Sequence, residues 1–315
     1  MKKPCIILTG PTAVGKTKLS IQLAKALNGA IVSADCMQVY RQLDIGSAKV
    51  TPEEMEGIPH YLIDCMDPRE DFDVARFQSM AKAAMEEIYA QGKLPIITGG
   101  TGFYIQALLK DVDFSESSGE SLIRRRLQEE FAQKGPAALH DRLRQVDPKA
   151  AEEIHPNNTK RVIRALEFFE ETGKPISDHN HEQKEKESPY TCCYFVLNDD
   201  RSLLYERINK RVDLMIEAGL VEEVRGLMEQ GLDESYLSMK GIGYKELFPY
   251  LRGDMPLDAC IETIKMESRR YAKRQLTWFR REKDVIWVNK QDFAYDEDKI
   301  LAFMLDTWKN KCKLT

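Results

Sequence analysis

Residues 10–17 read Gly-Pro-Thr-Ala-Val-Gly-Lys-Thr, a complete match to the pattern G-x-x-x-x-G-K-[ST]. An apolar run at 5–9 predicts a buried strand before the motif, and apolar residues at helical spacing in 16–27 predict a helix after it. A Gly-rich turn between a strand and a helix is the context in which this motif binds phosphate. Backbone N–H groups and Lys16 would hold a phosphate chain, and the Thr17 hydroxyl would ligate Mg²⁺. The motif alone does not show which phosphorylated molecule binds, and it does not decide whether ATP binds.

Strand-like and helical patterns alternate along the chain on the C-terminal side of this motif. Further strands are predicted at 30–33, 61–64 and 94–98, with a helix at 74–91 before the last of them. Strands that alternate with helices predict a parallel sheet covered by helices on both faces.

The pattern changes after residue 113. Residues 115–187 contain several helical stretches and almost no strand-like run, and strand patterns return at 192–197 and 285–288. We therefore predict an α/β fold in which 1–113 and 190–315 form a P-loop catalytic core with a parallel sheet. A mainly helical insertion would occupy 114–189.

The composition excludes several classes of protein. Of 315 residues 43% are hydrophobic and 31% charged, and no apolar run approaches the ~18 residues needed to cross a bilayer. The apolar run near the N-terminus is too short for a signal peptide. Seven cysteines without a C-x-x-C pair or a regular spacing argue against a disulfide framework and a zinc ribbon. We expect a monomeric cytoplasmic protein without membrane contact.

Charge is distributed unevenly along the chain. The net charge is −5, which by itself argues weakly against a nucleic-acid partner. Residues 264–283, however, contain eight Lys or Arg and two Glu. Because phosphate attraction acts within about a Debye length of the contacting face, this local excess matters more than the total. We interpret the segment as a phosphate-contacting helix, with a solvated helix face as the alternative.

Two loops are expected beside the phosphate loop, because the carboxyl ends of parallel strands meet at one edge of the sheet. The first contains Asp35, two residues past the strand at 30–33, although an Asp in this place also suits the N-cap of a following helix. The second is Thr-Gly-Gly-Thr-Gly at 98–102, whose residues suit a close approach to a ligand or a tight turn. A P-loop NTPase would usually place a metal-binding Asp there, so ATP hydrolysis is not expected.

Three other patterns have simpler interpretations. Residues 209–213, Asn-Lys-Arg-Val-Asp, are one residue too long for a guanine-binding N-K-x-D motif and lie in a helical pattern. His179 and His181 lie in a charge run that is typical of a solvated loop rather than a metal site. Trp278, close to Arg280 and Arg281, could stack on nucleobases or anchor its helix to the core.

Seven stretches spread over nearly the whole chain resemble the bacterial tRNA dimethylallyltransferases (tRNA isopentenyltransferases), in the order found in that family. They are GPTAVGKT at 10–17, SADCMQVYRQLDIGSAK at 33–49, GIPHYLID at 57–64, ITGGTGFYIQALL at 97–109, HPNNTKRVIRALE at 155–167, MKGIGYKEL at 239–247 and YAKRQLTWFRR at 271–281. The departures are mild: Cys36 replaces a common Ser, and Ser47 stands where Thr is usual. Such a set is far more specific than the phosphate loop alone.

The resemblance implies transfer of the dimethylallyl group of dimethylallyl diphosphate to N6 of the adenine immediately 3′ of the anticodon, with release of diphosphate. Asp35 would be the general base, and Lys16 would stabilise the leaving group together with Mg²⁺ held by Thr17. Thr101 would bind close to the reacting amine or the diphosphate. The insertion would contact the anticodon stem, and Gln38 would read a base of the loop.

The resemblance also implies two sets of binding residues. The diphosphate would be bound by Gly10, Thr12, Ala13, Val14, Gly15, Lys16, Thr17 and Arg211. The tRNA would be bound by Asp35, Gln38, Thr101, Arg124, Lys160, Arg161, Arg164 and Arg274.

Two alternatives use the same phosphate loop. A small-molecule or nucleoside-monophosphate kinase would use Asp35 to activate an acceptor hydroxyl and the insertion as a closing lid, but it has no need of the basic segment at 264–283. An RNA-binding P-loop switch protein has no need of a carboxylate base in the crevice.

Overall fold

The structure is a computed structural model that describes residues 2–114 and 122–312. It divides into two compact units, one formed by the residues up to 108 together with those from 190 on, and the other by 109–189. The predicted insertion at 114–189 lies within the second unit.

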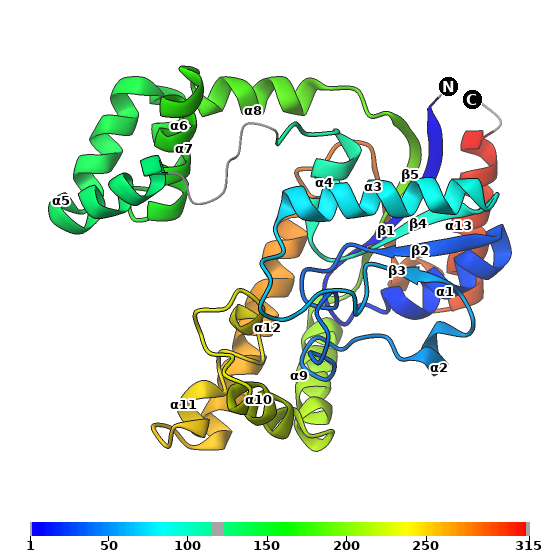
Figure 1. Ribbon diagram of the computed structural model, residues 1–315. Helices are drawn as coiled ribbons and strands as arrows, with labels where there is room; N and C mark the ends of the chain where they lie inside the picture. Colours follow the sequence, from blue (N-terminus) through cyan, green and yellow to red (C-terminus); the bar gives the residue numbers. More distant parts are fainter. Residues whose placement is uncertain (1, 115–121, 313–315) are drawn as a thin grey trace. The chain divides into compact units, whose positions relative to one another are not determined.

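The first unit contains a parallel sheet of six strands in the order β3-β2-β4-β1-β5-β6 (Figure 1). The strands are β1 (Lys3–Thr9), β2 (Gly29–Ser33), β3 (His60–Tyr61), β4 (Leu94–Gly99), β5 (Tyr190–Asn198) and β6 (Val285–Asn289). Each predicted strand is present, and the prediction of an α/β fold with a parallel sheet is confirmed.

The prediction of a strand at 61–64 is wrong in its length. The strand ends at Tyr61, because Leu62 and Asp64 have φ angles of 61° and 55°. A residue in the left-handed region cannot continue an extended strand, so the chain turns away from the sheet here.

Helices cover both faces of this sheet. In the first unit they are α1 (Lys16–Leu27), α2 (Pro52–Met55), α3 (Val74–Ala90), α4 (Gly102–Leu109), α9 (Arg201–Glu217), α10 (Leu220–Glu229), α11 (Phe248–Leu251), α12 (Leu257–Phe279) and α13 (Glu297–Cys312), with short 3₁₀ turns at Ser238–Lys240 and Lys290–Phe293. Ile6 and Leu8 of β1 belong to a core cluster with residues of α1, α9 and α13. Side chains alternate along a strand, so Ile7 points to the opposite face, and α3 packs on β2 and β4.

The phosphate loop depends on glycine at its first position. Gly10 has a φ of 147°, and a Cβ atom there would lie 2.5 Å from the carbonyl oxygen of Leu197 in β5. Only a residue without a side chain allows this approach between the loop and the neighbouring strand. The chain then enters α1 through Gly15, which also has a positive φ.

The second unit is helical. Its helices are α5 (Leu122–Val146), α6 (Pro148–Glu153), α7 (Thr159–Thr172) and α8 (Ile176–Glu185). A non-helical Gly135, followed by Pro136, interrupts α5. Leu127, Leu139 and Leu143 of α5 pack with Val162 and Leu166 of α7 in a separate apolar core.

The interpretation of the charge run that begins at Asp178 as a solvated loop is wrong. The run forms most of α8, and the ring of His179 packs at 4.9 Å from that of Phe168, which gives the helix an apolar contact. His181 is exposed and pairs with Glu185 one turn later. Within 2–114 and 122–312, no group of three or more His, Cys, Asp or Glu could hold a metal ion.

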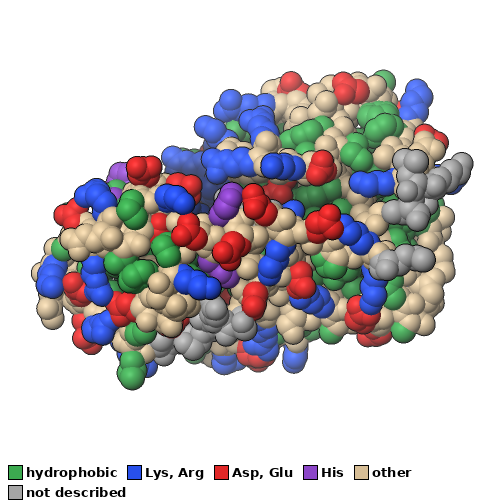
Figure 2. Space-filling model, turned by 90° about the horizontal axis from the view of Figure 1, so that it is seen from above, with side chains coloured by type: hydrophobic (Ala, Val, Ile, Leu, Met, Phe, Trp, Pro, Cys, Tyr) green, Lys and Arg blue, Asp and Glu red, His purple; other side chains and the backbone are tan. Residues whose placement is uncertain are grey.

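Charges of both signs are mixed over much of the surface. Figure 2 shows one face, on which Lys and Arg side chains gather in one region, whereas acidic and basic side chains alternate over most of the remainder. No helix among the described residues is both long enough and apolar enough to span a membrane.

Candidate active site

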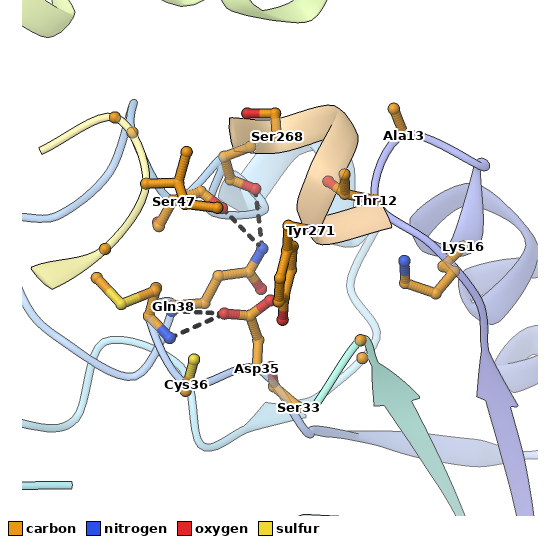
Figure 3. A pocket seen from close by; sticks show the side chains of 18 of the residues that line it. Thr12, Ala13, Lys16, Ser33, Asp35, Cys36, Gln38, Ser47, Ser268 and Tyr271 are labelled. Carbon is orange, nitrogen blue, oxygen red and sulfur yellow. Dashed lines mark hydrogen bonds between the residues drawn. The ribbon is translucent and has the colours of Figure 1, made fainter. Parts of the chain in front are cut away.

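A cavity of about 700 Å³ lies in the first unit at the carboxyl ends of β1, β2 and β4. This is the edge at which ligands bind in open parallel sheets. The phosphate loop lines one part of the cavity, Asp35 and Gln38 line another, and Ser268 and Tyr271 of α12 also line it (Figure 3). Residues of α9 add to the lining. Four segments of the chain therefore share one cavity.

Two cationic side chains lie on the phosphate-loop side of this cavity. Lys16 Nζ donates to the carbonyl oxygens of Gly10 at 3.0 Å and Pro11 at 2.8 Å. Arg211 of α9 donates from Nη1 to Thr12 Oγ1 at 3.2 Å. The position of Arg211 beside Thr12 is consistent with the predicted diphosphate contact.

The surroundings lower the pKa of both cations. Burial, and after it the nearby charge of Arg211, lower the pKa of Lys16 to about 8, and Asp35 opposes the shift. Burial also lowers the pKa of Arg211, again opposed by Asp35. Since the charge of Arg211 lowers the pKa of Lys16, an anionic ligand beside both cations would relieve their repulsion.

Asp35 lies in the loop after β2, with one carboxylate oxygen bound to its own loop. Asp35 Oδ1 accepts from the backbone N–H of Met37 at 2.8 Å and of Gln38 at 3.3 Å. The alternative that Asp35 caps a following helix is wrong, because the next helix, α2, begins only at Pro52. The other oxygen accepts no hydrogen bond from any residue that the structure describes, so it can receive a proton or a donor from a ligand.

Thr101 lies just before α4 and behind the cavity wall rather than in it. Its backbone N–H donates to the carbonyl oxygen of Ala34 at 3.3 Å. Its Oγ1 is buried close to the Tyr271 hydroxyl and the Cys36 thiol, and has no partner at hydrogen-bonding geometry among the described residues. The predicted contact of Thr101 with the amine or the diphosphate therefore stays a prediction.

Sequence reasoning missed Gln275 and Tyr271, which α12 brings into the site. Gln275 accepts from the Thr12 N–H at 2.9 Å and donates to the Gly100 carbonyl at 3.0 Å, so it joins the phosphate loop to the loop after β4. The ring of Tyr271 stands beside Asp35 in Figure 3. Both lie in a helix in which basic residues are the most conspicuous feature. No local sequence pattern distinguishes these two side chains from others of the helix that do not face the cavity.

Similarity to known proteins shows the family to which the chain belongs. A family model described as IPP transferase matches residues 38–282. The tRNA dimethylallyltransferase of Lachnoclostridium phytofermentans is 59% identical over 294 residues, which cover 93% of this chain and 94% of that protein. The chain belongs to the tRNA dimethylallyltransferase family. The resemblance noted in the sequence is thereby confirmed.

Further members of the family agree with this assignment. The tRNA dimethylallyltransferase of Acetivibrio thermocellus is 50% identical over 96% of this chain and 97% of that protein. The solved tRNA isopentenylpyrophosphate transferase of Bacillus halodurans is 45% identical, with 99% of each chain covered and a TM-score of 0.75. A eukaryotic dimethylallyltransferase solved acting on tRNA is 31% identical, covers 98% of this chain and 80% of its own, and has a TM-score of 0.84.

Four residues that the family resemblance assigns to tRNA lie in the second unit, and two of them are bound to a carboxylate there. Arg124 and Arg164 donate to the same Glu167 oxygen at 2.6 Å and 3.1 Å, and the Glu167 side chain is 0% exposed. These two arginines therefore compensate a buried charge within the unit. Lys160 and Arg161 are exposed in the first turn of α7.

A metal ion at the phosphate loop would depend on few protein ligands. Thr17 is exposed, lines the cavity, and its hydroxyl makes no hydrogen bond with the described residues. Mg²⁺ in phosphate sites takes one or two protein oxygens and completes its shell with phosphate and water. The free hydroxyl of Thr17 fits that requirement.

Proposed function

We propose that this tRNA dimethylallyltransferase transfers the dimethylallyl group of dimethylallyl diphosphate to N6 of the adenine immediately 3′ of the anticodon in tRNA, with release of diphosphate. The observation that carries the proposal is the single cavity that joins the phosphate loop, with Lys16 and Arg211, to the carboxylate of Asp35. In this cavity the donor can react with the acceptor amine while its diphosphate stays bound at the phosphate loop and the amine stays beside Asp35.

The phosphate-loop side of the cavity acts on the leaving group. As the C–O bond of the donor breaks, negative charge grows on the diphosphate, where the loop N–H groups, Lys16 and Arg211 are already in place. The Thr17 hydroxyl would hold Mg²⁺, which supplies additional charge stabilisation to the diphosphate.

The Asp35 side of the cavity acts on the nucleophile. The exocyclic nitrogen of adenine is weakly nucleophilic because its lone pair is delocalised into the ring. The Asp35 oxygen that has no partner accepts the N6 proton as the C–N bond forms, a contribution of about 10²–10⁴-fold. A stacked adenine cannot reach this carboxylate, so the base must be flipped into the cavity.

Phosphates of the tRNA would contact exposed basic residues. A shallow groove of about 390 Å³ is lined by Arg270, Lys273, Arg274, Thr277 and Trp278 of α12 and by Arg281, which follows the end of that helix. Lys273 and Arg281 make no ion pair with any residue in the described part of the chain, so they remain available to phosphate. Trp278 also packs edge-on against Phe103 of α4 at 6.0 Å, which supports its role as an anchor of α12. Lys160 and Arg161 would contact the anticodon stem.

We propose that the protein acts as a monomer, because a single chain supplies both the phosphate loop and the carboxylate of Asp35. We also propose that it acts in the cytoplasm, where its tRNA substrate is found.

The decisive experiment offers the purified protein undermodified tRNA with labelled dimethylallyl diphosphate or with labelled ATP, each with Mg²⁺ and with EDTA. We expect label in tRNA from the prenyl donor only, at the adenine 3′ of the anticodon, and loss of transfer in EDTA. Phosphoryl transfer from ATP to a small acceptor, without prenyl transfer, would instead identify a kinase.

A further inference from the structure

The loop at 44–48 is held by one carboxylate of a distant helix. Glu223 of α10 accepts from the backbone N–H groups of Asp44 at 3.0 Å, Ile45 at 2.7 Å and Gly46 at 3.1 Å. The Tyr244 hydroxyl donates to the same carboxylate at 2.7 Å. Glu223 therefore binds three consecutive amides and one buried hydroxyl, although it does not line the cavity itself.

The close packing of this loop leaves it little freedom. A Cβ atom at Gly46 would lie 2.5 Å from the Tyr244 ring, so the backbone lies directly against that ring. Ser47 Oγ donates to the Leu43 carbonyl at 2.6 Å, and the Ala48 N–H donates to the Ile45 carbonyl at 2.9 Å. The carbonyl oxygens of 47 and 48 are consequently held in a defined orientation.

Those two carbonyls set the orientation of the Gln38 amide in the cavity. Gln38 Nε2 donates to the Ser47 carbonyl at 3.3 Å and to the Ala48 carbonyl at 2.9 Å (Figure 3). Because an amide nitrogen has two N–H groups and both are used, the reversed rotamer would place an acceptor against two acceptors. Gln38 Oε1 accepts no hydrogen bond from the residues that the structure describes.

We propose that Glu223 is a positioning residue that acts through the loop at 44–48 to present Gln38 Oε1 as a fixed hydrogen-bond acceptor for a base of the anticodon loop. This inference rests on the proposed function, which supplies the RNA. A lone acceptor favours a base edge with an exocyclic amino group, as in adenine or cytosine. It disfavours the keto group that guanine and uracil present at the same place, because two acceptors would face each other.

The test is a double-substitution cycle with an RNA stem-loop as acceptor. Gln38→Met removes the amide at nearly constant size, and Glu223→Gln places an amide nitrogen against backbone N–H donors. Glu222→Gln is the matched control, because Glu222 is on the same helix and its side chain is 72% exposed. Its ion pair with Arg225 is long, at 4.0 Å. We measure kcat and KM for the stem-loop, the affinity for dimethylallyl diphosphate alone, and the melting temperature of each variant.

We expect Gln38→Met and Glu223→Gln each to lower kcat/KM for the stem-loop about tenfold or more, the effect of losing one well-placed hydrogen bond to a base. The double variant should be no worse than Gln38→Met within about twofold, because both substitutions remove the same hydrogen bond. Donor affinity should stay unchanged. Glu223→Asp should recover part of the loss, and Glu222→Gln should behave as the unmodified protein.

A second readout tests the base chemistry. In a series of stem-loops, each base near the target adenine that carries an amino group is converted in turn to its keto counterpart, adenine to inosine or cytosine to uracil. We expect the protein without substitutions to use one of these stem-loops poorly. Gln38→Met should not distinguish that RNA from its parent.

Multiplicative losses in the double variant, or a matching loss of donor affinity, would reduce Glu223 to a general structural role and overturn the proposal. A keto scan without effect would overturn the assignment of an amino group. Failure of the unmodified protein to prenylate any stem-loop would instead refute the proposed function, which the same assay measures independently.

Discussion

Individual side chains in the cavity divide the chemistry between a phosphate side and a carboxylate side. Asp35 has one oxygen bound by Met37 and Gln38 amides and one without a partner among the described residues. An asparagine can keep the first pair of hydrogen bonds through its carbonyl oxygen, but it cannot accept a proton. The loop geometry and the chemistry can therefore be separated by one substitution.

Asp35→Asn should lower single-turnover transfer about 100-fold or more, while the affinities for dimethylallyl diphosphate and stem-loop RNA stay within about threefold. Rapid-quench kinetics and equilibrium binding measure the two effects. Transfer that survives within tenfold of the unmodified rate would remove Asp35 from the role of base.

Lys16 makes donor binding depend on pH. Below its pKa of about 8 the amine is a cation, and above it the amine is neutral. The affinity for an anionic diphosphate should therefore be constant up to about pH 7.5 and fall as the pH rises through 8, by at most about tenfold per pH unit. Binding near pH 8 should take up protons, because the diphosphate raises the pKa of Lys16.

Lys16→Arg tests that assignment, because arginine stays charged over the same pH range. Its donor affinity should show no decline between pH 7 and 9 in calorimetric titrations. A decline of equal size in both proteins would point to a different titrating group.

At the scale of elements, α12 connects two ligand loops that the sheet alone does not connect. Gln275→Leu keeps the volume of the side chain but leaves the Thr12 N–H and the Gly100 carbonyl without their partner. The hydrogen bond to the Gly100 carbonyl is buried, and an unpaired buried group costs about 1–3 kcal/mol. We expect a lower melting temperature and weaker binding of dimethylallyl diphosphate, measured by calorimetry.

Thr277→Val, on the exposed side of the same helix, is the control and should change neither quantity. If the Gln275→Leu protein has the same melting temperature as the control and binds the donor normally, the two loops keep their positions without the hydrogen bonds of Gln275.

At the scale of the whole molecule, a protein with a net charge of −5 must bind a polyanion through local basic surfaces. If Arg161 binds phosphate, Arg161→Glu should make the slope of log K for tRNA against log salt shallower. The expected change is about 0.7–0.9 for each phosphate that the side chain no longer neutralises. The melting temperature should not change. Salt titrations with full-length tRNA measure this slope. An unchanged slope and affinity would exclude Arg161 from the binding surface.

Arg164→Glu should behave differently from Arg161→Glu. It places a second carboxylate against Glu167, whose side chain is 0% exposed, so the second unit should lose stability. A melting temperature equal to that of the unmodified protein would contradict this structural role.

The sequence alone predicted the alternation of strands and helices, the phosphate loop and the place of Asp35 at the edge of the sheet. These features depend on local patterns: apolar periodicity, a Gly-rich turn between a strand and a helix, and the rule that loops after parallel strands share one edge. The family resemblance added the reaction, because seven ordered motifs are specific where one motif is not.

Only the tertiary structure decided which groups hold those loops. The partners are far apart in the chain: 263 residues separate Thr12 from Gln275, 199 separate Thr12 from Arg211, and 178 separate Ile45 from Glu223. A hydrogen bond depends on distance and direction in space, and a glutamine or glutamate in a helical pattern has no local signal of what it faces. For the same reason, sequence could assign Arg164 to a phosphate but could not reveal that folding brings it against Glu167.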